Sequence, residues 1–162
     1  MKIKSLLMLM IASAALLFAS CENENSTEEL FSQEVTIQKG TTADLGQLKI
    51  SFDGPCKLVI HDKWDGPTVY YNTYISNVGH VSGLSAISII PGTGWVFEVE
   101  AVKGNGYVGR AEYWRATTRY AVEGNLVHTG QFYYTKMYVY DVVKDGSGNI
   151  LAVKIKYSPM EL

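Results

Sequence analysis

The stretch KMYVYDVVKDGSGNILAVKIKY, residues 136–157, carries the clearest fold signal in this sequence. Apolar residues alternate with polar ones on both sides of a Gly-Ser-Gly turn, which is the pattern of two antiparallel strands joined by a tight connection. A turn at Ser147-Gly148 sets the cross-strand partners. The predicted pairs are Tyr140 with Ile155, Val142 with Val153, and Asp141 with Lys154. The predicted core face of this hairpin consists of Tyr138, Tyr140, Val142, Leu151, Val153 and Ile155.

Upstream of the hairpin, short runs rich in Val, Ile, Thr, Tyr and Phe recur between Gly, Pro and Asp punctuation, and no long helical pattern is present. The predicted strands are 34–38, 47–52, 57–62, 68–76, 85–90, 94–102, 106–114, 117–123, 131–143 and 150–157. Many short strands at this spacing predict an all-β fold, an antiparallel β-sandwich or a small barrel. We expect one such domain over residues 35–162, because the 142 residues from Cys21 to the end of the 162-residue sequence are enough for one domain and too few for two.

The amino terminus is typical of a cleaved signal helix. Lys2 and Lys4 precede the apolar run Leu6–Phe18, which is shorter than the roughly 20 residues of a spanning helix. The run ends in Phe-Ala-Ser before Cys21, which resembles a bacterial lipobox. This predicts a signal peptide over residues 1–20 and a lipid on Cys21; the alternative is a plain secretory leader with a chance cysteine.

Residues 21–34 contain five glutamates and no basic residue, which indicates a lipidated, solvated acidic tether. An acidic run directly after a lipidated cysteine also resembles the export signals of lipoproteins displayed on the outer face of the outer membrane. The remaining residues are nearly balanced in charge, within a chain of formal net charge −2. This balance gives no drive toward nucleic acid.

Two glycine-rich stretches are informative as sequence motifs and not only through their composition. They are GHVSGLSAISIIPGTGW at residues 79–95 and GNGYVGR at residues 104–110, and the Tyr-x-x-x-Tyr-Val-Tyr-Asp and Val-Lys-Ile-Lys-Tyr segments follow them. Together they resemble an uncharacterised family of small lipoproteins from gut Bacteroidetes, a domain of unknown function, over roughly residues 65–162. The resemblance implies location and lineage, and no activity, cofactor or catalytic residue. Trp95 and Tyr107 within these stretches are expected to be core or half-core aromatics.

The densest polar cluster is HDKWD at residues 61–65. It could serve as a metal or acid/base site, but it lacks the paired histidines or cysteines of a zinc site and the converging oxygens of a calcium loop. We therefore expect a solvated turn, no metal and no cofactor. Cys56 is expected to be a small buried hydrophobe. In one extended strand, Cys56 and His61 would point to opposite faces, which disfavours a catalytic thiol.

Aromatic residues form the other candidate site. In the predicted strand 68–76, Val69, Tyr71, Thr73 and Ile75 share the expected core face, so Tyr70, Asn72 and Tyr74 face outward. With Trp64, the residues Tyr70 and Tyr74 are the candidate ligand-binding residues; the alternative is that another sheet or residues 117–123 cover them. A second group combines cationic and aromatic residues. Pairing of these cations with these rings within the domain explains the group as well as ligand binding does. Its members are Tyr113, Trp114, Arg115, Arg119 and Tyr120.

These observations lead to a functional expectation. The sequence predicts a surface-displayed, lipid-anchored, non-enzymatic β domain of the outer membrane that binds a glycan or an envelope protein. The alternatives are a small envelope or glycan hydrolase and a structural subunit of an envelope assembly. A hydrolase would require a nucleophile with its base, or a pair of catalytic carboxylates. The sequence shows neither arrangement at a recognisable spacing.

Overall fold

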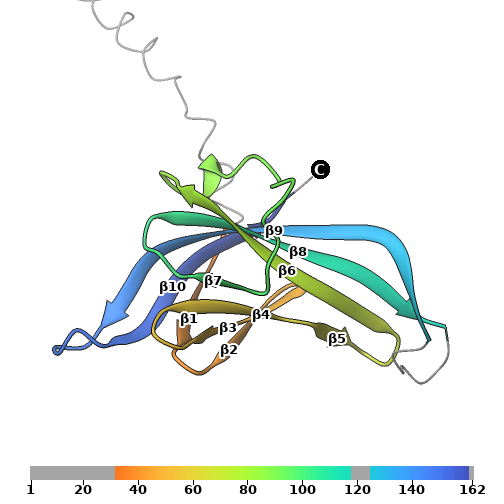
Figure 1. Ribbon diagram of the computed structural model, residues 1–162, viewed down its shortest axis with the longest axis horizontal. Helices are drawn as coiled ribbons and strands as arrows, with labels where there is room; N and C mark the ends of the chain where they lie inside the picture. Colours follow the sequence, from red (N-terminus) through yellow and green to blue (C-terminus); the bar gives the residue numbers. More distant parts are fainter. Residues whose placement is uncertain (1–31, 118–124, 161–162) are drawn as a thin grey trace, which may run out of the picture. The chain divides into compact units, whose positions relative to one another are not determined.

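The computed structural model describes residues 32–117 and 125–160, and this part of the chain is an all-β domain of two antiparallel sheets (Figure 1), which confirms the predicted fold class. The strands, in chain order, are β1 (Gln33–Gln38), β2 (Thr42–Leu45), β3 (Leu48–Asp53), β4 (Lys57–His61), β5 (Lys63–Asp65), β6 (Val69–His80), β7 (Glu98–Glu100), β8 (Asn105–Ala116), β9 (Leu126–Lys144) and β10 (Ile150–Pro159). A short 3-10 helix, η1 (Leu84–Ala86), follows β6. The strands β2 and β5 were not predicted. The predicted strand 117–123 lies almost entirely outside the described residues.

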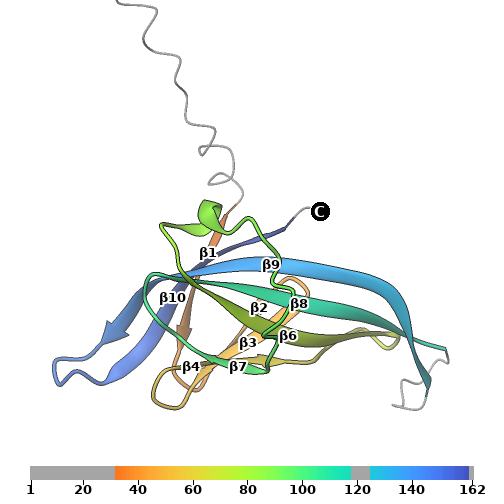
Figure 2. The same cartoon turned by 45° about the horizontal axis from the view of Figure 1, so that its top comes forward.

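The two sheets differ in size. The six-stranded sheet has the order β1-β10-β9-β8-β6-β5, and the four-stranded sheet has the order β2-β3-β4-β7. The long strands β6, β8 and β9 lie side by side, and the small sheet packs against one side of them (Figures 1 and 2). We call this side of the six-stranded sheet the inner face and the opposite side the outer face.

The main core lies between the inner face and the small sheet. Its largest fully buried side chains include Tyr107, Phe52 and Ile37. Gly109 allows the two sheets to approach, because a Cβ atom at this position would lie 2.2 Å from Cδ1 of Leu48. The expected burial of Tyr107 is confirmed.

Bridges join the two sheets at both edges. Lys39 forms a bridge with Phe52 at one edge, and Ile75 of β6 forms a bridge with Val96 at the other. The next residue, Phe97, accepts a hydrogen bond from the backbone N–H of Ile60 in β4. The architecture therefore combines the two predicted alternatives, since it is a sandwich whose edges are partly closed like those of a barrel.

The carboxy-terminal hairpin has a different register from the predicted one. Val142 pairs with Val153 and Asp141 pairs with Lys154, as expected, but Ile155 pairs with Val139. Tyr140 is therefore an extra residue in a β-bulge, so the residues of β9 that precede it point to the faces opposite to those predicted, and Leu151 is likewise an extra residue between Ile150 and Ala152. The predicted core positions of Tyr138, Tyr140 and Leu151 are wrong: both tyrosines are only half-buried, and Leu151 is exposed. Met137 and Val139 occupy the core instead.

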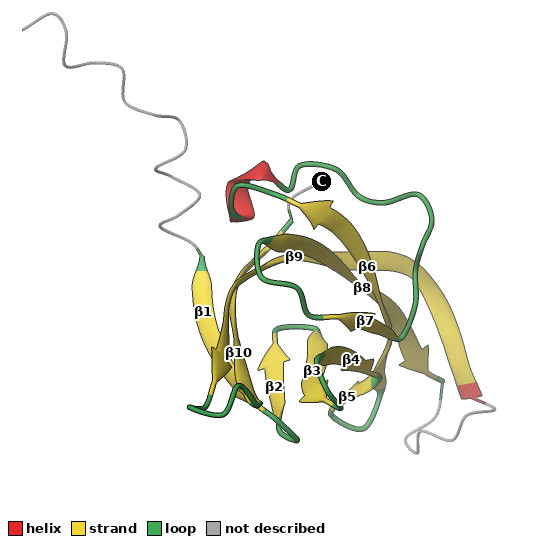
Figure 3. Cartoon of the chain, turned by 60° about the vertical axis from the view of Figure 1, so that its left-hand side comes forward, coloured by secondary structure: helices red, strands yellow, loops and turns green. Residues whose placement is uncertain are grey.

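Residues 85–90 do not form the predicted strand. The segment 81–97 instead crosses the outer face as a loop that begins with η1 (Figure 3). It packs Leu84 and Ile87 against Val108 in a second, smaller core. Of the predicted strand 94–102, only β7 is regular. The apolar run thus reflects contacts with a sheet surface below it, which periodicity alone does not distinguish from a buried strand.

Candidate binding surface

Pairing across β6, β8 and β9 sets which side chains share the outer face. Three rows cross these strands, since residues paired across an antiparallel sheet point to the same side. The rows are Tyr70, Trp114 and His128; Asn72, Glu112 and Phe132; and Tyr74, Arg110 and Tyr134. Trp64 of β5 pairs with Tyr70 and extends the first row.

The rings in these rows contact one another. The ring centroids of Trp64 and Tyr70 are 4.8 Å apart, and those of Trp114 and His128 are 4.9 Å apart. His128 also contacts Phe132 at 5.4 Å. Trp64 and Phe132 retain 44% and 40% of their surface exposed. We call this group the aromatic face; its members are Trp64, Tyr70, Tyr74, Trp114, His128, Phe132, Tyr134 and Trp95, which reaches it from the segment 81–97.

Arg110 lies at one end of the aromatic face. Its guanidinium carbon is 4.6 Å from the ring centroid of Trp95, 4.9 Å from that of Tyr74 and 5.9 Å from that of Phe132. Its Nη2 donates a hydrogen bond of 2.8 Å to Oε1 of Glu112. The rings and the carboxylate together hold the cation in one orientation.

Planar polar groups lie among the rings. Asn72 donates from Nδ2 to the hydroxyl of Tyr74 over 2.9 Å, and Glu112 lies next to Asn72 in the same row. Two donors in this region, Nε of Arg110 and Nε1 of Trp114, are buried and have no hydrogen-bond partner among the described residues. Unpaired buried donors are rare in folded proteins, and they mark this region as one where the fold does not satisfy every polar group.

The structure brings the three predicted residues together. Trp64 packs on Tyr70, and Tyr70 donates from its hydroxyl to Oδ2 of Asp62 over 2.5 Å. Tyr74 packs on Phe97, with ring centroids 5.2 Å apart. The predicted faces of this strand are confirmed, because Tyr71, Thr73 and Ile75 are buried on the inner side. Their role in binding stays a prediction.

Sequence analysis missed part of the aromatic face. Of the second group, Trp114 lies on the outer face, whereas Tyr113 packs at the inner face against Tyr71 and Tyr133. Arg119 and Tyr120 lie outside the described residues. Arg110, His128, Phe132 and Tyr134 were not predicted, because only the pairing of β8 with β9 brings them beside β6. For Arg110, alternation with the buried residues Gly109 and Ala111 was the signal that was present in the sequence.

The polar cluster at residues 61–65 does not converge on one site. His61 contacts Ser51 on the small sheet, with Nε2 2.7 Å from Oγ. Asp62 instead accepts from the backbone N–H of Thr73 on the large sheet, over 2.9 Å. Ser51 donates to Asp53, so its hydroxyl hydrogen points to a carboxylate and not to the imidazole. This is the reverse of a nucleophilic triad, in which serine donates to histidine.

Cys56 is half-buried against the main core, and its thiol donates to the carbonyl of Ala101 over 3.0 Å. Burial raises the pKa of this thiol, and the charge of Glu100 adds to the effect. A raised pKa lowers the thiolate fraction at neutral pH, which is the opposite of what a nucleophilic cysteine requires.

No protein-family model, curated protein or solved structure matches this chain. Within residues 32–117 and 125–160, no three His, Cys, Asp or Glu side chains are placed to hold a metal ion. No helix in the same described part is long and apolar enough to cross a membrane. Cys21 and the leader lie outside the described residues.

Proposed function

We propose that this protein is a lipid-anchored, surface-displayed binding domain without enzymatic activity, and that its aromatic face binds a glycan. The observation that carries the proposal is the interleaving of exposed rings with Asn72, Arg110 and Glu112 on one face. Sugars offer apolar C–H faces that stack on rings and hydroxyls that pair with amide, guanidinium and carboxylate groups. A protein-docking patch of aliphatic residues would lack this mixture.

The dimensions of the aromatic face suit an oligosaccharide. Adjacent strands lie about 4.8 Å apart and alternate residues in a strand about 6.8 Å apart. The first row, which runs from β5 to β9, therefore spans roughly 14 Å, and so does the distance from the first row to the third. A chain of a few sugar rings covers this length.

The hydrolase alternative has less support. The hydrogen bonds of Ser51 run in the wrong direction for a nucleophile, and the pKa of Cys56 is raised. On the aromatic face itself, Glu112 is held by Arg110 and has no second carboxylate beside it in its row. Glycoside hydrolysis in its usual form needs two.

The test uses the chain from residue 22, which contains every described core residue and lacks the predicted lipid. A glycan array selects a ligand, and calorimetry then measures its affinity for the Tyr70→Ala/Tyr74→Ala variant. We expect affinity to fall at least tenfold, because central aromatic residues dominate such interfaces. The melting temperature should change little, because both residues lie outside the main core.

Tyr140→Ala is the matched control. Tyr140 is also a half-buried outer-face tyrosine whose hydroxyl donates to a carboxylate, that of Glu34, but it lies outside the aromatic face. This control should bind the glycan like the wild type. Undiminished affinity of the double variant, or equal loss in the control, would exclude the aromatic face as the binding surface. Mass spectrometry of the membrane fraction tests the anchor separately, through the presence or absence of lipid on Cys21.

A further inference from the structure

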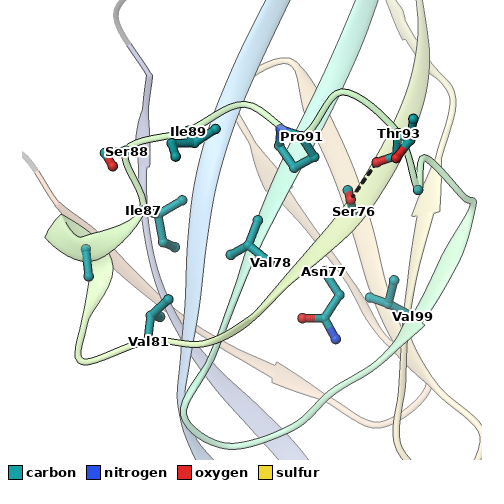
Figure 4. Close-up of a pocket in the computed structure, with 12 residues that line it drawn as sticks. Ser76, Asn77, Val78, Val81, Ile87, Ser88, Ile89, Pro91, Thr93 and Val99 are labelled. Carbon is teal, nitrogen blue, oxygen red and sulfur yellow. Dashed lines mark hydrogen bonds between the residues drawn. The ribbon is translucent and has the colours of Figure 1, made fainter.

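A pocket of about 620 Å³ lies beside β6, between this strand and the segment that crosses above it (Figure 4). Ser76, Asn77 and Val78 line it from β6, and Val99 lines it from β7. Figure 4 shows Ile87, Ile89, Pro91 and Thr93 along the crossing segment. The volume falls within the range of small-molecule sites, about 300–1,000 Å³.

The segment above the pocket is anchored at two ends. At one end, Leu84 and Ile87 are buried against the outer face. At the other end, Val96 exchanges two backbone hydrogen bonds with Ile75, and the hydroxyl of Ser76 donates to the carbonyl of Thr93 over 3.4 Å. Between these anchors, Ile89 remains 76% exposed although it lines the pocket. The segment is therefore held against β6 at both ends, and the large apolar side chain of Ile89 is left with little to pack against.

The chemistry of the lining selects the ligand. None of the residues that line the pocket carries a charge, and most contribute apolar surface. A charged ligand would lose its hydration there without a compensating partner. The polar side chains of the lining, Ser76, Asn77, Ser88 and Thr93, are all uncharged. Asn77 lies on the side of β6 away from Ile87 and Ile89 (Figure 4), where its Oδ1 accepts from the backbone N–H of Gly79 over 2.8 Å.

We infer that this pocket is a second binding site, separate from the aromatic face, for a neutral and mainly apolar small molecule. The ligand packs against Val78, Ile87 and Ile89. The inference does not depend on glycan binding, because the two sites share no residue.

Fluorescent probes test the inference on the chain from residue 22. Prodan is a neutral naphthalene with a ketone, N-phenyl-1-naphthylamine is neutral without a carbonyl, and 1-anilinonaphthalene-8-sulfonate is an anion of similar size. We expect both neutral probes to bind saturably at one site and the anion to bind at least tenfold more weakly. The inference is overturned if neither neutral probe saturates or if the anion binds equally well.

Two variants locate the site. Ile89→Asp places a carboxylate in the lining at an exposed position and should weaken both neutral probes at least tenfold. Val127→Asp is its control, since Val127 is 53% exposed and does not line the pocket. Equal effects of these two variants would refute the assignment of the pocket.

The Tyr70→Ala/Tyr74→Ala variant should bind both probes normally, which separates failure of this inference from failure of the proposed glycan site.

Discussion

Tyr107 and Tyr74 lie on neighbouring strands of one sheet but on opposite faces. Tyr107 has no exposed surface, and its hydroxyl donates to the carbonyl of Glu100 over 2.7 Å and accepts from the backbone N–H of Val102. Tyr74 is half-buried, and its hydroxyl accepts from the side chain of Asn72. Backbone groups of the fold therefore satisfy the inner tyrosine, whereas a side chain that a ligand can also contact satisfies the outer one.

The two faces also differ in how closely another layer approaches. On the inner face, Gly109 provides space for Leu48 of the small sheet. On the outer face, the paired positions around Arg110 carry full-size side chains, and Trp64 and Phe132 remain exposed. The inner face is therefore closely packed against the small sheet, whereas the outer face leaves side chains exposed for contact with a ligand. Substitutions on the inner face should therefore change stability, and those on the outer face should change binding.

The largest expected effect is that of Tyr107→Ala. It removes a fully buried ring and leaves two backbone groups without their partner, so the free energy of unfolding should fall by about 3–5 kcal/mol. Urea denaturation followed by circular dichroism measures this. Tyr107→Phe keeps the ring and should cost clearly less. If the alanine variant loses as little unfolding free energy as the phenylalanine variant, the proposed difference between the inner and outer faces is wrong.

Gly109→Ala comes next. The added methyl group would overlap Cδ1 of Leu48, so either the sheets separate or Leu48 changes rotamer, at a cost of about 1–3 kcal/mol in unfolding free energy. Gly146→Ala is the control, because a Cβ atom there has no neighbour within 4 Å. Denaturation curves of the two variants that coincide would contradict close packing at the inner face.

Arg110→Lys sharpens the outer side of the comparison. Lysine keeps the charge but loses the planar group that contacts three rings and Glu112, at a cost to unfolding free energy of about 1 kcal/mol. Glycan affinity should fall at least tenfold, because the fixed planar donors are gone. Thermal melting and calorimetry on the same sample separate the two effects. A loss of stability with unchanged affinity would assign Arg110 to the fold and not to the surface.

The smallest effect is expected at Asp145, in the turn of the carboxy-terminal hairpin. A hydrogen bond from the side chain of Asn149, with further bonds from nearby backbone N–H groups, lowers the pKa of this carboxyl. A carboxyl whose pKa is lower in the folded state stabilises the fold above its unfolded pKa of about 3.9, and this contribution is lost as the pH falls through the folded value.

Asp145→Ala should therefore lower the melting temperature slightly at pH 7, and the difference from wild type should shrink toward pH 2. Melting curves across this range provide the measurement. A difference that stays constant with pH would show that the carboxylate charge contributes nothing. Because this turn belongs to neither face, glycan affinity should be unchanged.

Local patterns were sufficient for the fold class and for the faces of single strands. The alternation in residues 69–75 correctly assigned Tyr71 and Tyr70 to opposite sides, because the pleat of an extended backbone sets this within the strand itself. The same reasoning was wrong in the carboxy-terminal hairpin for Tyr138 and Tyr140, before and at the bulge. A bulge changes the register there, and it depends on how β9 packs between β8 and β10.

The sequence by itself determined that this is an all-β chain with rings on alternate faces, since composition, turn residues and period are local properties. Only the tertiary structure decided that Arg110 lies between Trp95 and Tyr74, and that the apolar run 85–90 covers a sheet instead of joining one. Both outcomes require contacts between segments far apart in the chain. The order of the strands and the packing of their side chains set such contacts, and no local pattern encodes them.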